Sequence, residues 1–172
     1  MTHLALFLLG SFQAKLNHES VAQFEYDKMR ALLAYLALEA QDPQRRDALA
    51  GFLWPERPED AARHNLRQAL SNLRRLLQDN QSPTPFLHLT REAVHFPDSS
   101  QAWFDVRLFD SLLEACRHHD HLHVEACTTC VDRLQQAIDL YRGEFMEGFF
   151  LDESSAFEEW VEKKRPDNNR QM

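Results

Sequence analysis

The stretch that decides the fold reads PEDAARHNLRQALSNLRRLLQ and runs from Pro58 to Gln78. Proline suits the first position of a helix, and the carboxylates of Glu59 and Asp60 favour the positive end of the helix dipole. Apolar residues then recur with helical period and fall within one arc of about 120°. They are Ala62, Leu66, Ala69, Leu70, Leu73, Leu76 and Leu77. The stretch therefore predicts one long amphipathic helix.

The opposite face of this helix is basic, with no acidic residue between Arg63 and Arg75. Guanidinium groups bind phosphate oxygens and guanine edges, and Gln and Ser side chains can contact other base edges or phosphates. A charged helix face is often only a solvated face. Here the charge is of one sign, which favours a DNA-binding interpretation. The candidate DNA-binding residues of the helix are Arg63, Arg67, Gln68, Ser71, Arg74 and Arg75.

Upstream of this helix the sequence predicts a small sheet followed by two helices. Alternating apolar residues indicate short strands over residues 4–8, 12–14 and 21–24. Helical periodicity predicts helices over residues 27–40 and 45–54, the second ended by Pro55.

Downstream of it, residues 86–89 and 93–96 predict a hairpin whose turn carries Arg91. A sheet, three helices and a terminal hairpin, in that order, describe an α+β winged helix. In that fold the third helix enters the major groove and the hairpin touches the flanking backbone or minor groove. Arg91 is therefore the seventh candidate DNA-binding residue.

A domain boundary is predicted at residues 97–100, where a polar segment coincides with a shift in charge. Residues 1–96 balance 11 basic against 11 acidic residues, so the whole net charge of −8 lies in the rest, with 8 basic and 16 acidic residues. We expect a DNA-binding domain over residues 1–97 and an all-helical segment over residues 98–172. The latter should hold helices near 105–116 and 127–141, and a third opened by a capping box of Ser155 and Glu158.

Composition excludes several classes of protein. The 172 residues are 44% hydrophobic, enough for a real core, but no apolar run is long enough to cross a bilayer and no signal-peptide pattern is present. The four glycines form no nucleotide-binding loop. Nine histidines offer acid–base chemistry by number alone, without a recognisable nucleophile–base motif. We therefore expect a cytoplasmic, nucleoid-associated protein that is not an enzyme.

Several motifs resemble those of the SARP-type bacterial transcriptional activators. In the first half these are LLG at 8–10, DK at 27–28, ALLAYLA at 31–37, LWP at 53–55 and NLRQALSNLRR at 65–75. In the second half, WFDV at 103–106 with Phe109, and Ala137 with LYRGEF at 140–145, are similar to the helical bacterial transcriptional activator domain. The resemblance spans most of residues 4–162.

This resemblance implies an OmpR-type winged helix followed by a tetratricopeptide-like helical segment. It also implies binding to direct repeats in double-stranded DNA at promoters, dimers or tandem protomers, and recruitment of RNA polymerase. Only about three helices follow the boundary, so the activator domain is expected to be partial. The alternative function is a helical protein-interaction module, or a truncated regulator that no longer activates by itself. Salt dependence separates DNA binding from apolar protein contacts, because only phosphate contacts release counterions.

Two pairs of metal-binding residue types lie near the predicted helix ends of the second half. Cys116 and His119 form one pair, and Cys127 and Cys130 form the other. Closed Cys/His sets favour tetrahedral zinc, which predicts a structural zinc site between two helices. His118 or His121 could replace His119. The alternative is a core cysteine, two first-turn cysteines and a solvated polar connector.

Large apolar residues are dense at the end of the chain. Five large apolar residues fall within this small helical set: Phe145, Phe149, Phe150, Phe157 and Trp160. Helical repeats need neighbours to cover their apolar faces. We therefore expect these five residues to be buried against the winged helix or in a homodimer.

Overall fold

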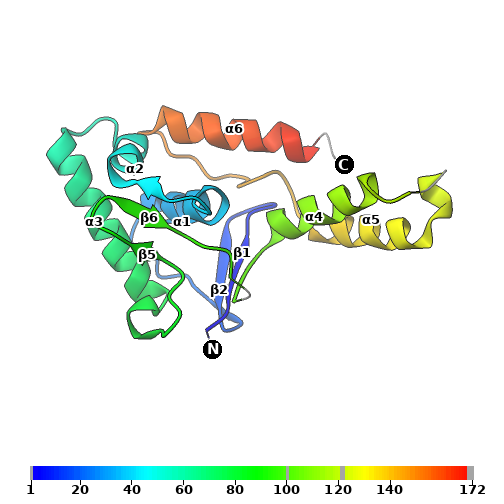
Figure 1. Ribbon diagram of the computed structural model, residues 1–172. Coiled ribbons are helices and arrows are strands. Elements are labelled where there is room, and N and C mark those ends of the chain that lie inside the picture. Colours follow the sequence, from blue (N-terminus) through cyan, green and yellow to red (C-terminus); the bar gives the residue numbers. More distant parts are fainter. Residues whose placement is uncertain (1, 100, 121–122, 170–172) are drawn as a thin grey trace.

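A computed structural model describes residues 2–99, 101–120 and 123–169 of the chain (Figure 1). Two small sheets and a set of helices form a mixed α+β fold, in agreement with the sequence-based expectation. The larger sheet has the strand order β3-β2-β1-β7, and the smaller sheet has the order β4-β6-β5. The strands are β1 (Leu4–Phe7), β2 (Gln13–Leu16), β3 (Glu19–Ser20), β4 (Gln44–Arg45), β5 (His88–Leu89), β6 (Ala93–His95) and β7 (Ala102–Phe104).

The third strand lies earlier than the sequence predicted. Asn17 and His18 both have positive φ, 52° and 71°, and make a tight turn directly after β2. The chain therefore pairs again at once, with Lys15 opposite Ser20, and residues 21–24 form no strand. Val21 instead packs against the core from outside the sheet.

Three helices lie between β3 and β5 along the chain, as expected from the periodicity. They are α1 (Asp27–Glu39), α2 (Arg46–Leu53) and α3 (Glu59–Leu76), followed by a short 3-10 turn, η1 (Asp79–Gln81). α1 lies in the centre and buries Leu32, Leu33 and Leu36 completely. The leucine stripe of α3 is buried as predicted, including Leu66, Leu70 and Leu73. The smaller sheet contains β4, which the sequence did not predict and which ties the start of α2 to the hairpin β5–β6.

The chain returns to the larger sheet after the hairpin, so the expectation that everything beyond residue 100 is helical is wrong. β7 pairs parallel to β1, with Leu4 opposite Ala102 and Leu6 opposite Phe104. The Trp103 ring packs on the Phe7 ring at a centroid distance of 5.1 Å. Three apolar residues before a helix can extend that helix or form an edge strand, and pairing with β1 decides between them.

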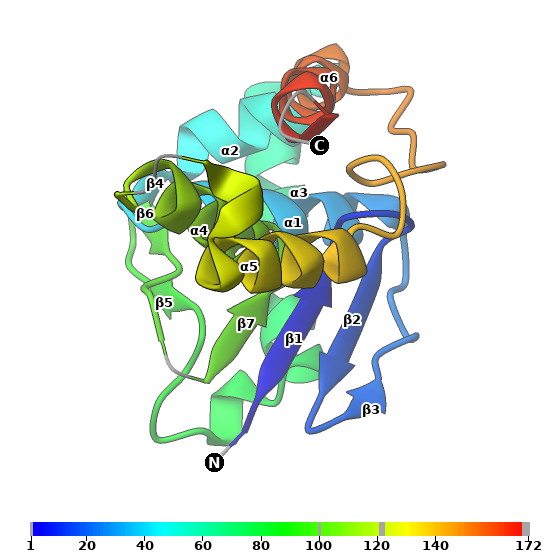
Figure 2. The same cartoon turned by 90° about the vertical axis from the view of Figure 1, so that its right-hand side faces the viewer.

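A pair of helices projects from this body (Figures 1 and 2). These are α4 (Asp105–Arg117) and α5 (Thr128–Leu140), with the 3-10 turn η2 (Val124–Ala126) before α5. After α5 the chain passes beside the end of β1, where Gly10 has a φ of +112°. A Cβ on Gly10 would lie 3.1 Å from Cβ of Arg142, so this close approach requires glycine.

The last helix, α6 (Ser155–Asn169), returns over α2 (Figure 2). Its N-cap is Ser154 and not the predicted Ser155, because Oγ of Ser154 accepts the N–H of Phe157 at 3.2 Å. The same hydroxyl donates to the carbonyl oxygen of Phe52 in α2 at 2.6 Å, which fixes the start of α6 on the N-terminal half.

The aromatic residues near the end of the chain mostly pack inward, as predicted. Phe145 and Phe157 are fully buried, and the half-buried Trp160 ring contacts Tyr35 of α1 at 5.2 Å between centroids. Phe149 packs on Phe157 at 5.9 Å. Phe150 departs from the prediction with 62% exposure. Among the described residues, none of the helices combines the length and apolar character that a membrane span requires.

Candidate nucleic-acid interface

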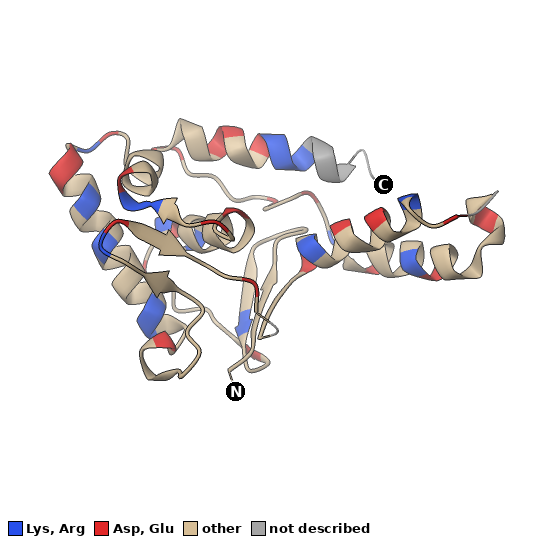
Figure 3. Cartoon of the chain, in the orientation of Figure 1, with Lys and Arg blue, Asp and Glu red and all other residues tan. Residues whose placement is uncertain are grey.

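The basic face of α3 lies on the outside of the molecule (Figure 3). Arg67 and Gln68 are exposed on this helix, and Arg91 is exposed on the turn between β5 and β6. Arg63, Ser71 and Arg75 are exposed as well, whereas Arg74 is only half-exposed. Arg67 therefore projects fully outward from the basic face, whereas Arg74 does so only in part.

Five arginines from three segments line one open cavity of about 600 Å³. α3 supplies Arg63 and Arg67, the hairpin turn supplies Arg91, and the junction of β4 and α2 supplies Arg45 and Arg46. Asp47, Leu66 and Glu92 complete the lining. We call this cavity the arginine cleft. It is a concave, mainly cationic surface beside an exposed helix, which is an arrangement suited to a phosphate backbone.

Backbone hydrogen bonds hold the three segments of the arginine cleft together. Arg45 pairs with Ala93 across β4 and β6, and the N–H of Arg46 donates to the carbonyl oxygen of Glu92 at 2.9 Å. In the hairpin turn, Oγ1 of Thr90 accepts the N–H of Ala93 at 2.9 Å. The position of Arg91 is therefore set by the turn and by β4, not by a flexible loop.

The arginines of the cleft differ in how their charge is compensated. Arg63 forms ion pairs with Asp47 at 2.8 Å and with Glu59 at 2.6 Å, and these carboxylates raise the pKa of its guanidinium. Within the described parts of the chain, the other four arginines of the cleft form no ion pair. Four of the five positive charges are thus left for an external anion.

Arg46 is the arginine of the cleft whose environment disfavours its positive charge. Burial, and then the neighbouring charge of Arg67, lower the pKa of its guanidinium. Its Nε atom is enclosed and has no hydrogen-bond partner among the residues that the structure describes. An enclosed polar atom without a partner costs free energy, so the fold itself gains little from this placement.

The remaining predicted residues lie outside the cleft. Arg75 donates to Glu25 at 2.9 Å, and Asn72 binds the same carboxylate at 3.0 Å. Nε of Arg74 is enclosed without a partner among the described residues, and the charge of Arg74 acts on the carboxyl of Asp79. The structure thus gathers Arg63, Arg67 and Arg91 in the cleft, and leaves Gln68, Ser71, Arg74 and Arg75 elsewhere on α3.

Sequence reasoning missed Arg45 and Arg46. They form a basic pair at the junction of β4 and α2, and helical periodicity predicts only the start of a helix there. Their place in the cleft depends on the β4–β6 pairing, which two residues of sequence cannot predict.

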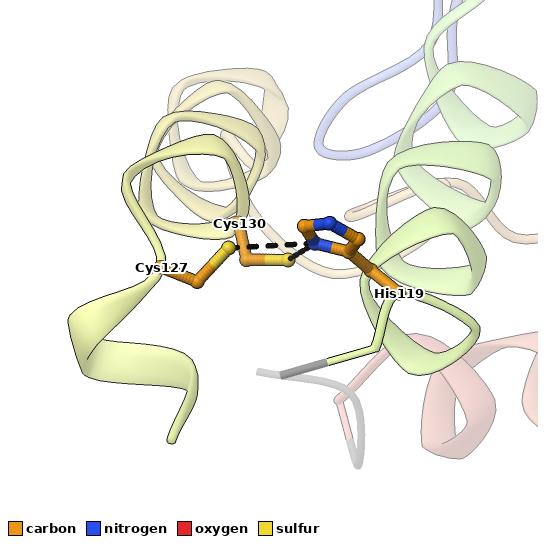
Figure 4. A group of neighbouring side chains, drawn as sticks. All are labelled: His119, Cys127 and Cys130. Carbon is orange, nitrogen blue, oxygen red and sulfur yellow. Dashed lines mark hydrogen bonds between the residues drawn. The ribbon is translucent and has the colours of Figure 1, made fainter. Parts of the chain in front are cut away.

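A second group of functional side chains lies at the far end of α4 and α5 (Figure 4). Nδ1 of His119 is 3.1 Å from Sγ of Cys130 and 3.4 Å from Sγ of Cys127. All three ligand atoms lie within 4.8 Å of one another, so this group could hold a metal ion. Sγ of Cys116 lies 3.7 Å from the carbonyl oxygen of Cys130. Burial, together with the Cys116 and Cys127 thiols, raises the pKa of the Cys130 thiol to about 11.

The fold is similar to that of EmbR from Mycobacterium tuberculosis, a SARP-family regulator whose structure was determined in complex with a low-affinity phosphopeptide. The TM-score is 0.75 at 23% sequence identity, and the match covers 99% of this chain. It covers 44% of the EmbR chain, so this chain spans less than half of that protein. No family model matches the sequence, and no curated protein matches it. The chain therefore has the fold of part of a SARP-family regulator, as the sequence motifs predicted.

Proposed function

We propose that this protein is a sequence-specific regulator of transcription that binds double-stranded DNA. The observation that carries the proposal is the arginine cleft. It gathers five guanidinium groups from α3, the hairpin turn and the start of α2, in a chain with a net charge of −8. An acidic protein that concentrates unpaired cations on one surface has a local field of the opposite sign there, and local fields decide where polyanions bind.

The proposed docking geometry is that of a winged helix. α3 enters the major groove with its exposed face, and the hairpin β5–β6 contacts the flanking backbone through Arg91. Arg45, Arg46 and Arg67 then surround the phosphates between these two elements. Gln68 and Ser71 lie on the exposed face of α3, where side chains reach base edges. Arg74 and Arg75, further along the helix, complete the predicted set.

The second half, residues 98–172, is proposed to be part of a tetratricopeptide-like activator domain. Its assigned partner is RNA polymerase or another part of the transcription machinery, and two protomers are expected to occupy repeated half-sites as a homodimer. This function requires no enzymatic activity and places the protein at the nucleoid in the cytoplasm. These assignments rest on the motif resemblance and on the shared fold.

Selection of binding sites from random duplexes with the purified chain tests the proposal and also reports the spacing of repeats. Affinity for the selected site is then measured by fluorescence anisotropy over a series of salt concentrations. With about four neutralised phosphates, the slope of log affinity against log salt should be near −3.6.

Arg67→Ala should weaken binding about tenfold and make this slope shallower by about 0.9, since one phosphate contact is lost. The matched control is Arg117→Ala, which removes the same charge from an exposed position on α4. Equal affinities for the two variants and the wild type at matched salt would contradict the proposed interface.

A protein-interaction module remains the second candidate. α5 exposes Val131 and Ile138, at 44% and 52%, on the projecting helix pair. These residues are seven apart and so lie on the same side of α5. No enrichment of any duplex in the selection, together with salt-independent binding of a protein partner, would favour this function.

A further inference from the structure

We infer that a zinc ion binds to His119, Cys127 and Cys130, with Cys116 as the fourth ligand, and closes the end of the helix pair α4–α5. This inference is independent of DNA binding, because the cluster and the arginine cleft share no residue. Its ligand is identified by the donor set. Two or three thiols with one imidazole nitrogen are the set that tetrahedral zinc prefers in structural sites.

The distances between the donor atoms fit a zinc ion with little movement. Zn–S bonds of about 2.3 Å and Zn–N bonds of about 2.0–2.1 Å place nitrogen and sulfur roughly 3.6 Å apart in a tetrahedron. Nδ1 of His119 lies 3.1 Å from Sγ of Cys130 and 3.4 Å from Sγ of Cys127. The imidazole and both thiols therefore point to one common position (Figure 4).

Cys116 lies beside the cluster, although its Sγ does not belong to the set of donor atoms within 4.8 Å of one another, so its side chain has to move to bind the metal. It is buried, and its Sγ lies 3.7 Å from the carbonyl oxygen of Cys130, beside the same turn of α5. Cys116 and His119 are three residues apart at the end of α4, and Cys127 and Cys130 are three apart at the start of α5. The site thus takes one ligand pair from each helix, which is the usual arrangement for a metal that joins two elements.

The start of α5 offers the ligand pair a local positive field. Cys127 is the N-cap of α5 and Cys130 lies in its first turn, which contains no acidic residue. The positive end of the helix dipole is therefore not compensated by a carboxylate, and thiolates on zinc would supply the negative charge.

The connector between the two helices contributes no described residue to a core. Among the described residues between Arg117 and Cys127, none is buried. Buried apolar residues of the pair lie further along the helices, such as Leu113 and Ala137. Since none of these described residues anchors the connector in an apolar core, a metal bound between the helix ends would set their separation, as it does in small metal-stabilised domains.

The test measures zinc in the full chain purified without a histidine tag, by elemental analysis. We expect one zinc per chain in the wild type. After replacement of zinc by Co²⁺, we expect the intense visible absorption and sulfur-to-metal charge-transfer bands of tetrahedral thiolate ligation. Less than about a tenth of an equivalent of zinc after addition of zinc and dialysis, or a Cys127–Cys130 disulfide in place of bound metal, would overturn the inference. Neither measurement depends on a variant folding.

Variants then assign the ligands. His119→Ala and Cys127→Ser should lose the stoichiometric zinc, and Cys116→Ser should weaken zinc binding at least about 100-fold, as measured by competition with a chromophoric chelator. The control is His118→Ala, which removes a neighbouring imidazole that binds Glu114 instead. Wild-type zinc affinity in Cys116→Ser would overturn the assignment of Cys116 as the fourth ligand. Loss of zinc in the control would overturn the assignment of His119.

Discussion

The arginine cleft and the junction between β1 and α4 differ in whether their charged groups have compensating partners. At the junction, the fully buried carboxylate of Asp105 accepts the backbone N–H groups of Leu8, Leu9 and Val106 at 2.8–2.9 Å. Arg142 lies 3.8 Å from the same carboxylate. In the cleft, several guanidinium groups share one cavity and Arg67 has no ion pair within the described residues.

This difference separates charges that hold the fold together from charges that are available to a ligand. Burial raises the pKa of Asp105, but the N–H groups and Arg142 oppose that shift and give both carboxylate oxygens partners. In the cleft, burial and the charge of Arg67 both disfavour the charged form of Arg46. Local features that work against stability without compensation are expected at functional sites. We therefore assign the junction to the fold, and the difference supports the proposal that the cleft binds DNA.

The largest effect predicted by this comparison is the loss of stability on removal of Asp105. Asp105→Ala leaves three enclosed backbone N–H groups without their acceptor, and these belong to the segment directly after β1 and to α4. We expect the free energy of unfolding to fall by roughly 3–5 kcal/mol. Urea unfolding followed by circular dichroism measures it.

Asp132→Ala is the control for Asp105→Ala, because it removes an exposed carboxylate from α5. Its free energy of unfolding should stay within about 0.5 kcal/mol of the wild type. Equal stabilities of the two variants would show that the Asp105 junction contributes nothing special to the fold.

The sequence predicted the elements whose signal is local. The stripe of leucines in α3 and the turn residues of the hairpin lie within single windows of the chain, and both were placed correctly. Asp105 lies at the start of the helix predicted near residues 105–116, whereas its main partners are Leu8 and Leu9, 97 and 96 residues earlier. Contacts of that range depend on β7 pairing with β1, which no local pattern encodes.

The two candidate sites show the same limit. The cysteine and histidine pairs could be identified because each pair is three residues apart, one turn of a helix. The arginine cleft was found in part, through Arg63, Arg67 and Arg91. Arg45 and Arg46 reach it only through the short strand β4, whose two residues carry no sequence signal.

A smaller effect of opposite sign is predicted within the cleft. Asp47 neutralises Arg63 in the free protein, so a phosphate must compete with its carboxylate. Asp47→Asn should raise affinity for the selected DNA about threefold, since exposed ion pairs contribute up to about 1 kcal/mol. Fluorescence anisotropy at fixed salt measures it. Asp132→Asn makes the same change in net charge on α5. An equal gain in DNA affinity in that variant would show that the effect comes from net charge and not from the release of Arg63.

The smallest predicted effect concerns a third charged contact, which lies between α1 and α6. Oε1 of Glu39 accepts the indole N–H of Trp160 at 2.9 Å and pairs with Lys164 at 2.8 Å. Burial raises the pKa of Glu39, but the bonds from Lys164 and Trp160 outweigh burial and lower its pKa overall. The carboxylate is therefore favoured by the fold.

A lowered pKa in the folded state fixes the sign of the pH dependence of this contact. Its contribution should be complete above the unfolded carboxyl pKa of about 4.3, and should be lost as the pH falls through the lower pKa of the folded state. Glu39→Gln keeps an acceptor for Trp160 but removes the charge. We expect the variant to be less stable than the wild type by about 0.5 kcal/mol at pH 7, a small value because the pair is about one-third exposed. That difference should shrink towards zero in acid, as measured by urea unfolding from pH 7 down to the lowest pH at which the wild type folds.

Glu159→Gln, at an exposed position on α6, should show no such trend. A stability difference for Glu39→Gln that does not vary with pH would mean that the amide perturbs packing, and that the charge of Glu39 does not help to hold α6.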